Sequence, residues 1–187
     1  MKKSLIVAAM MLLTAAAQAQ TITASDVMAT YQNAVNNTDG KYCYNADVEQ
    51  GVVRTQYVYL KVKEGRGRHA IQTLRPHLKY QYDYDNEGRL LTRTTQLWNG
   101  DLADWQPTCQ LSYTYLPGQN IVECSYWDSL GQSFEHPQSK VVYEVLPNAS
   151  IGFVSNYHRV KGQADYVLSE MMAVPNQMFY GSDLVSK

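Results

Sequence analysis

"YQYDYDNEGRLL", residues 80–91, places alternating tyrosines ahead of a short polar stretch and two leucines. Tyr80, Tyr82 and Tyr84 alternate with Gln81 and Asp83, which is the period of a strand with one buried and one solvated face. The next four residues, Asp-Asn-Glu-Gly, are typical of a turn between two antiparallel strands. The stretch therefore predicts a β-hairpin.

The same stretch has a second interpretation, because its acids could bind a metal. Asp83, Asp85, Glu87 and Gly88 match the first half of a calcium loop, which also needs an acid at its twelfth position. Counted from Asp83, that position is Thr94. The corresponding turns further along the chain, "LPGQN" and "LPNAS", contain no acid. These observations favour a turn over a calcium site or a catalytic carboxylate cluster, and we predict no metal site.

The hairpin recurs along the chain as a repeat of about 30 residues. Each copy has a proline, a tyrosine six residues later, a turn, and an aliphatic residue that begins the next strand. The aligned stretches are "RPHLKYQYDYDNEGRLL", "QPTCQLSYTYLPGQNIV" and "HPQSKVVYEVLPNASIG", with the pairs Pro76 and Tyr82, Pro107 and Tyr113, and Pro137 and Tyr143. Four to five copies are visible, so the repeat predicts the architecture of the whole chain.

Two strands per repeat predict a mainly all-β fold, an antiparallel meander of about ten strands. A twisted sheet of that size rarely stays flat, so we expect a strongly curled sheet or a partly closed barrel. A single helix is expected over residues 20–37, with Val27, Met28, Tyr31 and Val35 on one face and Ser25 or Asp26 as its cap. We expect this helix to dock on the sheet as part of a single domain, residues 20–187.

The first nineteen residues have the layout of a cleaved signal peptide. Lys2 and Lys3 are followed by an apolar run of about a dozen residues and then by Ala17-Gln18-Ala19. The run is shorter than the roughly 20 residues that span a bilayer. We therefore expect an exported protein in the periplasm, at the cell surface or outside the cell, without a membrane span.

Composition narrows the classes of function. The formal net charge of −1 provides no basic field for nucleic acid. The four histidines show no metal-ligand spacing, and no nucleophile, zinc-protease or phosphate-binding motif is present. We therefore expect neither a cofactor nor catalytic residues. The chain is rich in tyrosine, with 15 Tyr against 3 Phe and 3 Trp, which suits half-buried strands.

Three cysteines leave their pairing open. Cys43, Cys109 and Cys124 are an odd number, so at most one intramolecular bridge can form and one thiol is left over. The alternative is that all three are buried free thiols, because free cysteine is usually a small buried hydrophobic residue. The sequence does not decide which pair would bridge.

Aromatic residues recur near the strand ends of successive hairpins. Trp98 and Trp105, and likewise Trp127 and Phe134, are seven positions apart, and Tyr157 and Tyr166 follow in the next repeat. They predict either a ladder of cross-strand pairs that fixes the strand register or a strip that binds a glycan or a protein. Trp98, Trp105, Trp127 and Phe134 are the candidate binding residues.

The stretches "YDYDNEGRLLTRTTQLWNG" and "WNGDLADWQPTCQLSYTYLPGQN" resemble the tyrosine-rich repeats of exported Bacteroidetes proteins, in particular the Bacteroides secreted domain-of-unknown-function family 3836. "YDYDNEGRL" also resembles, more loosely, the tyrosine-aspartate repeat of Rhs-type shells. The first resemblance covers nearly all of the mature chain and implies an exported β-sheet protein of a gut bacterium with no assigned activity. It supplies no catalytic residues.

These observations predict an exported, non-enzymatic protein of the bacterial envelope or surface. Its expected role is structural or adhesive, or that of a ligand-binding module that presents one face or rim of the sheet to a glycan or a protein. The alternative is a secreted hydrolase, which a deep pocket lined by His69, His77 or Asp83 would favour.

Overall fold

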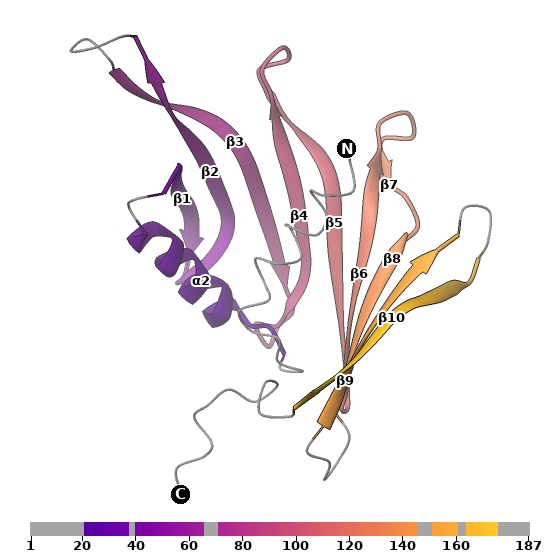
Figure 1. Cartoon of the computed structure of the whole chain (residues 1–187). Coiled ribbons are helices and arrows are strands. Elements are labelled where there is room, and N and C mark those ends of the chain that lie inside the picture. The colour runs from indigo at the N-terminus through magenta and orange to yellow at the C-terminus, as the bar shows by residue number, and fades with distance from the viewer. Residues whose placement is uncertain (1–20, 38–39, 66–70, 146–150, 161–163, 176–187) are drawn as a thin grey trace, which may run out of the picture. The chain divides into compact units, whose positions relative to one another are not determined.

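The computed structural model describes residues 21–37, 40–65, 71–145, 151–160 and 164–175 (Figure 1). The predicted signal peptide, residues 1–19, lies outside the described residues, as do His69 and the turn at 146–150. Within the described part of the chain, no helix combines the length and the apolar character that a membrane span requires.

Within the described residues, one helix and ten strands follow one another. Their bounds are α2 Ala24–Asn36, β1 Tyr42–Glu49, β2 Val52–Glu64, β3 Ile71–Tyr84, β4 Leu90–Asn99, β5 Asp104–Leu116, β6 Gln119–Asp128, β7 Ser133–Phe134, β8 Ser139–Val145, β9 Ile151–Arg159 and β10 Tyr166–Pro175. Each strand pairs with the next in the order β1-β2-β3-β4-β5-β6-β8-β9-β10, and β7 pairs with β6 alone. The predicted antiparallel meander is confirmed. Among the described strands the order does not close into a barrel, because β1 and β10 each have one neighbour.

Contacts between residues divide the chain into two units. The first unit contains Ile22–Tyr113 and Cys124–Gln138, and the second contains Thr114–Glu123 and the chain from Ser139 onward. The first unit carries α2 and most of the residues singled out by the sequence.

The stretch at residues 80–91 forms the predicted hairpin, and Asp85 closes its turn. The Asp85 Oδ1 accepts hydrogen bonds from the backbone N–H of Glu87 and of Arg89, both at 2.9 Å. Its Oδ2 accepts a third, at 2.6 Å, from the Arg89 Nε. Gly88 has a φ of +77°, a conformation that residues with a Cβ rarely adopt. The turn interpretation of this acidic stretch therefore agrees with the structure.

The same turn anchors the start of the helix. The Gly88 carbonyl accepts a hydrogen bond from the Ala24 N–H, and the Ile22 carbonyl accepts one from the Leu90 N–H. The helix cap is Thr23, so the expected cap at Ser25 or Asp26 is wrong. Asp26 instead reaches back from the first turn, where its carboxylate accepts from the Thr23 N–H at 2.8 Å. From this anchor α2 packs against β1 and β2.

Two prolines of the repeat lie beside β-bulges. Pro76 is opposite Tyr59 where the β2–β3 register shifts, and Pro107 is opposite Gln96 where the β4–β5 register shifts. A bulge leaves one residue outside the regular ladder, so a residue without an N–H is tolerated there. This explains why a proline can recur inside paired strands.

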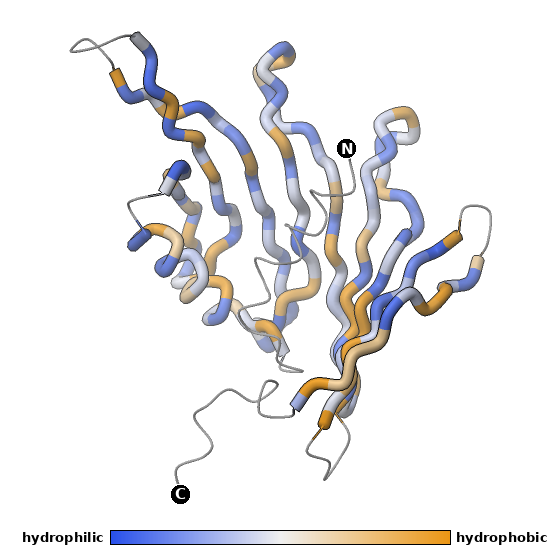
Figure 2. Tube along the Cα trace, in the orientation of Figure 1, coloured by the Kyte–Doolittle hydropathy of each residue, from blue (hydrophilic) through white to orange (hydrophobic). Residues whose placement is uncertain are grey.

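Strand register separates the first unit's sheet into two faces, and hydrophobic and hydrophilic residues are interspersed along its strands (Figure 2). On what we call the core face, Gln56 is opposite Tyr80, and Tyr80 is opposite Thr95, which in turn is opposite Cys109. Tyr82, Arg93 and Leu111 are opposite one another on the same face. The buried side chains of this face in the first unit include Val53, Gln56, Val58, Tyr82, Leu90, Arg93, Thr95 and Leu111.

Candidate functional site

The other side of this sheet, which we call the solvent face, carries a pair of tryptophans. Trp98 on β4 and Trp105 on β5 are directly opposite in the register, next to the tip of the β4–β5 hairpin. Their ring centroids are 5.1 Å apart and their planes are inclined by 70°, an edge-to-face contact. Both side chains are partly exposed. The seven-residue spacing in the sequence therefore corresponds to a true cross-strand pair.

Two neighbouring strands extend this pair into a larger patch. The Tyr57 ring on β2 is 6.2 Å from the Trp105 ring, and the Lys79 Nζ on β3 lies 5.9 Å from the centre of the same ring. Tyr57 and Lys79 are directly opposite each other in the register. We call Tyr57, Lys79, Trp98 and Trp105 the tryptophan cluster. It crosses four adjacent strands, β2 to β5, and all four side chains are partly exposed.

Polar side chains border the tryptophan cluster on the same face. Gln96, two residues before Trp98, donates a hydrogen bond from its Nε2 to the Gln81 Oε1 at 2.8 Å. Next to them the Gln110 Nε2 donates to the Thr94 hydroxyl at 3.1 Å. The Tyr57 hydroxyl donates to the Asp47 Oδ2 at 2.9 Å. Amide and carboxylate groups thus surround the rings, and such groups can exchange hydrogen bonds with a bound polar ligand.

Trp127 and Phe134 form a second pair of the same kind. They are directly opposite each other on β6 and β7, with ring centroids 5.0 Å apart and planes inclined by 72°. Asp128 closes the hairpin tip beyond them, because its carboxylate accepts from the Leu130 and Gly131 N–H groups. In the first unit, the β4–β5 and β6–β7 tips lie at the same end of the strands (Figure 1). The structure thus assembles the four candidate binding residues as two separate pairs.

The third expected pair differs. Tyr157 is opposite Leu168 and Tyr166 is opposite Arg159, so the two tyrosines are not a cross-strand pair, and the ladder prediction is wrong at this position. Instead the Lys140 Nζ lies 4.9 Å from the Tyr157 ring and 4.5 Å from the Tyr166 ring. A cation therefore links the rings that sequence spacing predicted to meet directly.

The acidic residues of the stretch 80–91 do not form a binding or catalytic site. Asp83 accepts a hydrogen bond from the Thr92 hydroxyl, while Asp85 is held within its own turn. Burial acts to raise the pKa of Asp85, but the hydrogen bonds from Arg89 and Glu87 lower it overall. Among the described residues no group of three His, Cys, Asp or Glu side chains could hold a metal ion. His77, one of the residues expected to line a deep hydrolase pocket, instead stacks on Tyr42, with the two ring centroids 5.6 Å apart.

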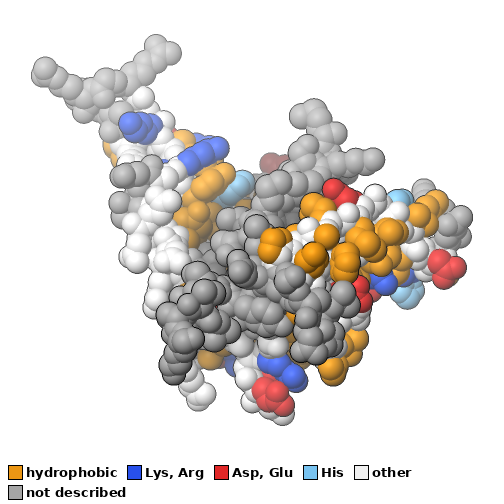
Figure 3. Space-filling view, turned by 60° about the horizontal axis from the view of Figure 1, so that its bottom comes forward, with side chains coloured by type: hydrophobic (Ala, Val, Ile, Leu, Met, Phe, Trp, Pro, Cys, Tyr) orange, Lys and Arg blue, Asp and Glu red, His pale blue; other side chains and the backbone are white. Residues whose placement is uncertain are grey.

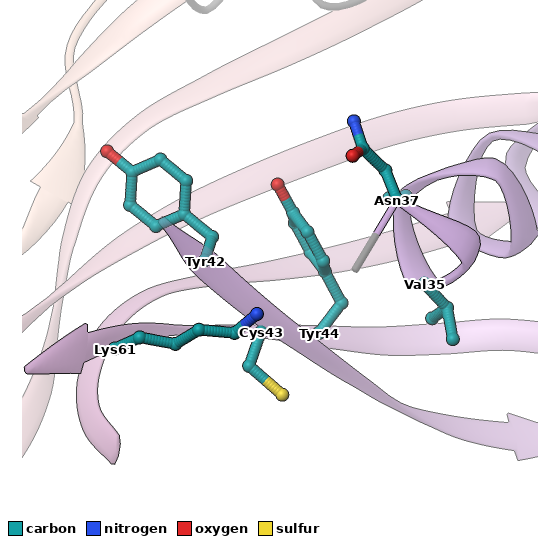
Figure 4. A pocket seen from close by; sticks show the side chains of 7 residues that line it. Val35, Asn37, Tyr42, Cys43, Tyr44 and Lys61 are labelled. Atoms are coloured by element: carbon teal, nitrogen blue, oxygen red, sulfur yellow. The ribbon is translucent and has the colours of Figure 1, made fainter. Parts of the chain in front are cut away.

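A small pocket of about 100 Å³ lies between the end of α2 and β1 (Figure 4). Val35, Asn37, Tyr42, Cys43, Tyr44 and Lys61 are among the side chains that line it. Figure 4 shows the Cys43 sulfur pointing away from the rings of Tyr42 and Tyr44, as alternation along a strand requires. Sequence reasoning did not identify this pocket, because it depends on where α2 ends.

Sequence reasoning also missed a buried arginine on the core face. Arg93 is 5% exposed, and its guanidinium lies 5.4 Å from the centre of the Tyr80 ring. Beside it, the Tyr82 hydroxyl donates a hydrogen bond to the Gln56 Oε1 at 2.9 Å, and burial raises the pKa of Tyr82. The two-residue period of a strand could have predicted this burial, because it places Arg93 and Thr95 on the same side of β4.

Comparison with known proteins identifies relatives of unknown function. A family model described as "Family of unknown function (DUF3836)" matches residues 1–145. A protein of unknown function from Bacteroides fragilis has a similar solved structure, with 18% identity and a TM-score of 0.59, covering 78% of this chain and 99% of that one. At this identity the likeness shows a shared fold.

Two further solved structures are DUF3836 family proteins. The one from Bacteroides vulgatus is 23% identical, with a TM-score of 0.44 and coverage of 51% of this chain and 89% of that one. The one from Parabacteroides distasonis is 18% identical, with a TM-score of 0.44 and coverage of 74% and 94%. No curated protein matches the chain.

Proposed function

Given that the chain belongs to the DUF3836 family, whose function is unknown, we propose that it is an exported, non-enzymatic module of the bacterial envelope that binds glycans through its solvent face. The observation that carries the proposal is the tryptophan cluster, in which partly exposed rings from β2, β4 and β5 meet beside the Lys79 ammonium group of β3. The basic start and short apolar run before Ala17-Gln18-Ala19 support export.

The chemistry around the cluster favours a glycan. Flat aromatic faces stack on the C–H faces of sugar rings, while amide, hydroxyl and carboxylate groups pair with sugar hydroxyls. The pairs formed by Gln81 with Gln96 and by Tyr57 with Asp47 place such groups at the border of the rings. Lys79 adds a positive charge, so acidic sugars would gain an additional attraction.

A purely structural role for the same rings is the competing account. Edge-to-face pairs stabilise a folded protein by about 0.5–1.5 kcal/mol beyond the area they bury, and cross-strand pairs help to fix register. Both accounts predict that Trp98 and Trp105 touch. They differ in what happens when one ring is removed from a protein that remains folded.

The experiment screens the purified protein on an array of mucin glycans and polysaccharides, and then measures the affinity of Trp98→Ala and Trp105→Ala for the best glycan. We expect each variant to lose about tenfold or more in affinity, equivalent to about 1.4 kcal/mol, while its circular dichroism spectrum is unchanged. Tyr157→Ala, a partly exposed strand aromatic outside the cluster, is the matched control and keeps the wild-type affinity.

Two results would overturn the proposal. Retention of the wild type on a protein array but on no glycan would identify a protein-binding face. Unfolding of Trp98→Ala and of the double variant Trp98→Ala/Trp127→Ala, with no glycan affinity in the wild type, would establish the structural ladder.

A further inference from the structure

The structure brings two of the three cysteines together. Cys109 lies on β5 and Cys124 on β6, neighbouring strands of one hairpin, and both belong to the first unit. The two thiols are close enough that each shifts the pKa of the other, downward for Cys109 and upward for Cys124. Cys124 is 2% exposed, whereas Cys109 is partly exposed. The pair therefore combines one partly exposed cysteine residue with one buried cysteine residue.

The third cysteine is on the opposite face of the sheet. Cys43 is opposite Tyr59 in the β1–β2 register, whereas the adjacent Tyr44 is opposite Val58. Val58 shares the core face with Gln56, and the register connects that face to Cys109. Three strands also separate β1 from β5 in the sheet, at roughly 4.8 Å per strand. A bridge from Cys43 to either partner is excluded by this arrangement, because the two Cβ atoms must approach to about 4 Å.

The surroundings of Cys109 favour a thiolate. The neighbouring Cys124 thiol lowers the pKa of the Cys109 thiol most, and the charge of the buried Arg93 lowers it further, against the opposing effect of burial. The same contact with Cys109, together with burial, raises the pKa of Cys124. A thiolate held in this way is the nucleophile in thiol–disulfide exchange.

We propose that Cys109 and Cys124 form a redox-active dithiol that closes to an intramolecular disulfide by exchange with an external disulfide, either a small one such as glutathione disulfide or that of a dithiol oxidoreductase. Cys109 attacks one sulfur of the external disulfide, that S–S bond breaks, and the first thiolate leaves. The Cys124 sulfur then attacks Cys109, the mixed disulfide breaks, and the second thiolate leaves. Two electrons pass to the external disulfide, and the two protons of the dithiol end on the two thiols released.

This inference is independent of the proposed glycan site, which lies on the other face. The dithiol on the core face and the tryptophan cluster on the solvent face share no residue. A negative result for one proposal therefore does not contradict the other, because glycan affinity tests the first and the number of free thiols tests the second.

The experiment treats the reduced, purified protein with glutathione disulfide and then counts free thiols by maleimide labelling in denaturant. We expect the wild type to fall from three labelled cysteines to one. Digestion after tyrosine, which cuts the hairpin at Tyr113 or Tyr115 between the two cysteines, should give two peptides joined by the Cys109–Cys124 bridge. Cys43→Ser is the matched control and should fall from two labelled cysteines to none.

The order of attack has its own test. Cys124→Ser should retain glutathione on Cys109 as a stable mixed disulfide, whereas Cys109→Ser should acquire little at Cys124. If either variant fails to fold, peptide mapping of the wild type and of Cys43→Ser still decides the pairing. A bridge that contains Cys43, three labelled thiols after oxidation, or a glutathione adduct mainly on Cys124 would overturn the proposal.

Discussion

On the core face of the first unit, Tyr82 and Tyr84 extend inward and donate their hydroxyls to the Gln56 side chain and the Val53 carbonyl. On the solvent face, Tyr57 donates instead to the exposed Asp47, and its ring meets a tryptophan and a lysine. Both faces are rich in aromatic residues. The comparison shows that a tyrosine in an alternating strand has two roles: on one face it replaces aliphatic residues in a core, and on the other it builds a surface.

The largest expected effect contrasts adjacent leucines that point to opposite faces. Leu90 is 0% exposed, whereas Leu91 is 40% exposed. Leu90→Ala should lower the free energy of unfolding by about 2–5 kcal/mol, because it leaves a cavity, and Leu91→Ala by less than about 0.5 kcal/mol. Urea denaturation measures both. Equal losses of unfolding free energy in the two variants would contradict the assignment of Leu90 to a buried face and Leu91 to an exposed one.

Removal of one hydroxyl from each face sharpens the comparison. Tyr82→Phe leaves the buried Gln56 without this donor and should cost about 1–3 kcal/mol of unfolding free energy. Tyr57→Phe removes a bond to an exposed carboxylate and should cost less than about 0.5 kcal/mol. The measurement is again chemical denaturation. A larger loss of unfolding free energy in Tyr57→Phe than in Tyr82→Phe would contradict the assignment of the core face.

The turn that leads from β3 to β4 supplies a smaller effect. Gly88 has a φ of +77° and nothing within 4 Å of the position of an added Cβ, so Gly88→Ala tests backbone strain alone. We expect a loss of about 1 kcal/mol. Gly100 also has open space but lacks a positive φ, so Gly100→Ala should be neutral or slightly stabilising. Thermal unfolding of the two variants compares them directly.

The smallest effect concerns acid stability at the same turn. Hydrogen bonds within the turn lower the pKa of Asp85 despite the opposing effect of burial. A carboxyl whose pKa is lower in the folded state stabilises the protein above its unfolded-state pKa, and this contribution is lost as pH falls through the folded-state value. Asp85→Asn should therefore lose stability at neutral pH and show a weaker decline below about pH 4. Asp83→Asn is the control, and an identical acid profile for both variants would contradict this role.

Strand period and repeat spacing were sufficient to predict the meander, the acidic turn and two aromatic pairs. The pair Trp98 and Trp105 is seven residues apart, which the register of the β4–β5 hairpin accommodates. Tyr157 and Tyr166 are nine residues apart, and the β9–β10 register pairs Tyr157 with Leu168 instead. A repeat in sequence predicts that strands recur, but the connection between strands sets which residues face each other.

Other features depended on contacts that the sequence pattern does not encode. Arg93 was missed because a charged residue in a strand is normally exposed, and its burial depends on the Tyr80 ring of the neighbouring strand. The helix cap at Thr23 was missed because Ser25 and Asp26 are equally good cap residues. The Gly88 carbonyl, which accepts from the Ala24 N–H, fixes where the helix starts.

Exposure also distinguishes β10 from the other strands. Val167, Leu168, Met171 and Met172 are each between 42% and 53% exposed, and hydrophobic side chains gather over this part of the second unit (Figure 3). As the last strand in the described order, β10 pairs only with β9. The pattern differs from the first unit, in which apolar side chains are buried on one face.

The most direct test of the account measures glycan affinity and thermal unfolding of Trp98→Ala side by side with the wild type. The account predicts a loss of about tenfold or more in affinity for the array-selected glycan with a folded, cooperatively unfolding variant. Unchanged affinity in the folded variant would contradict the claim that the solvent face is a binding surface.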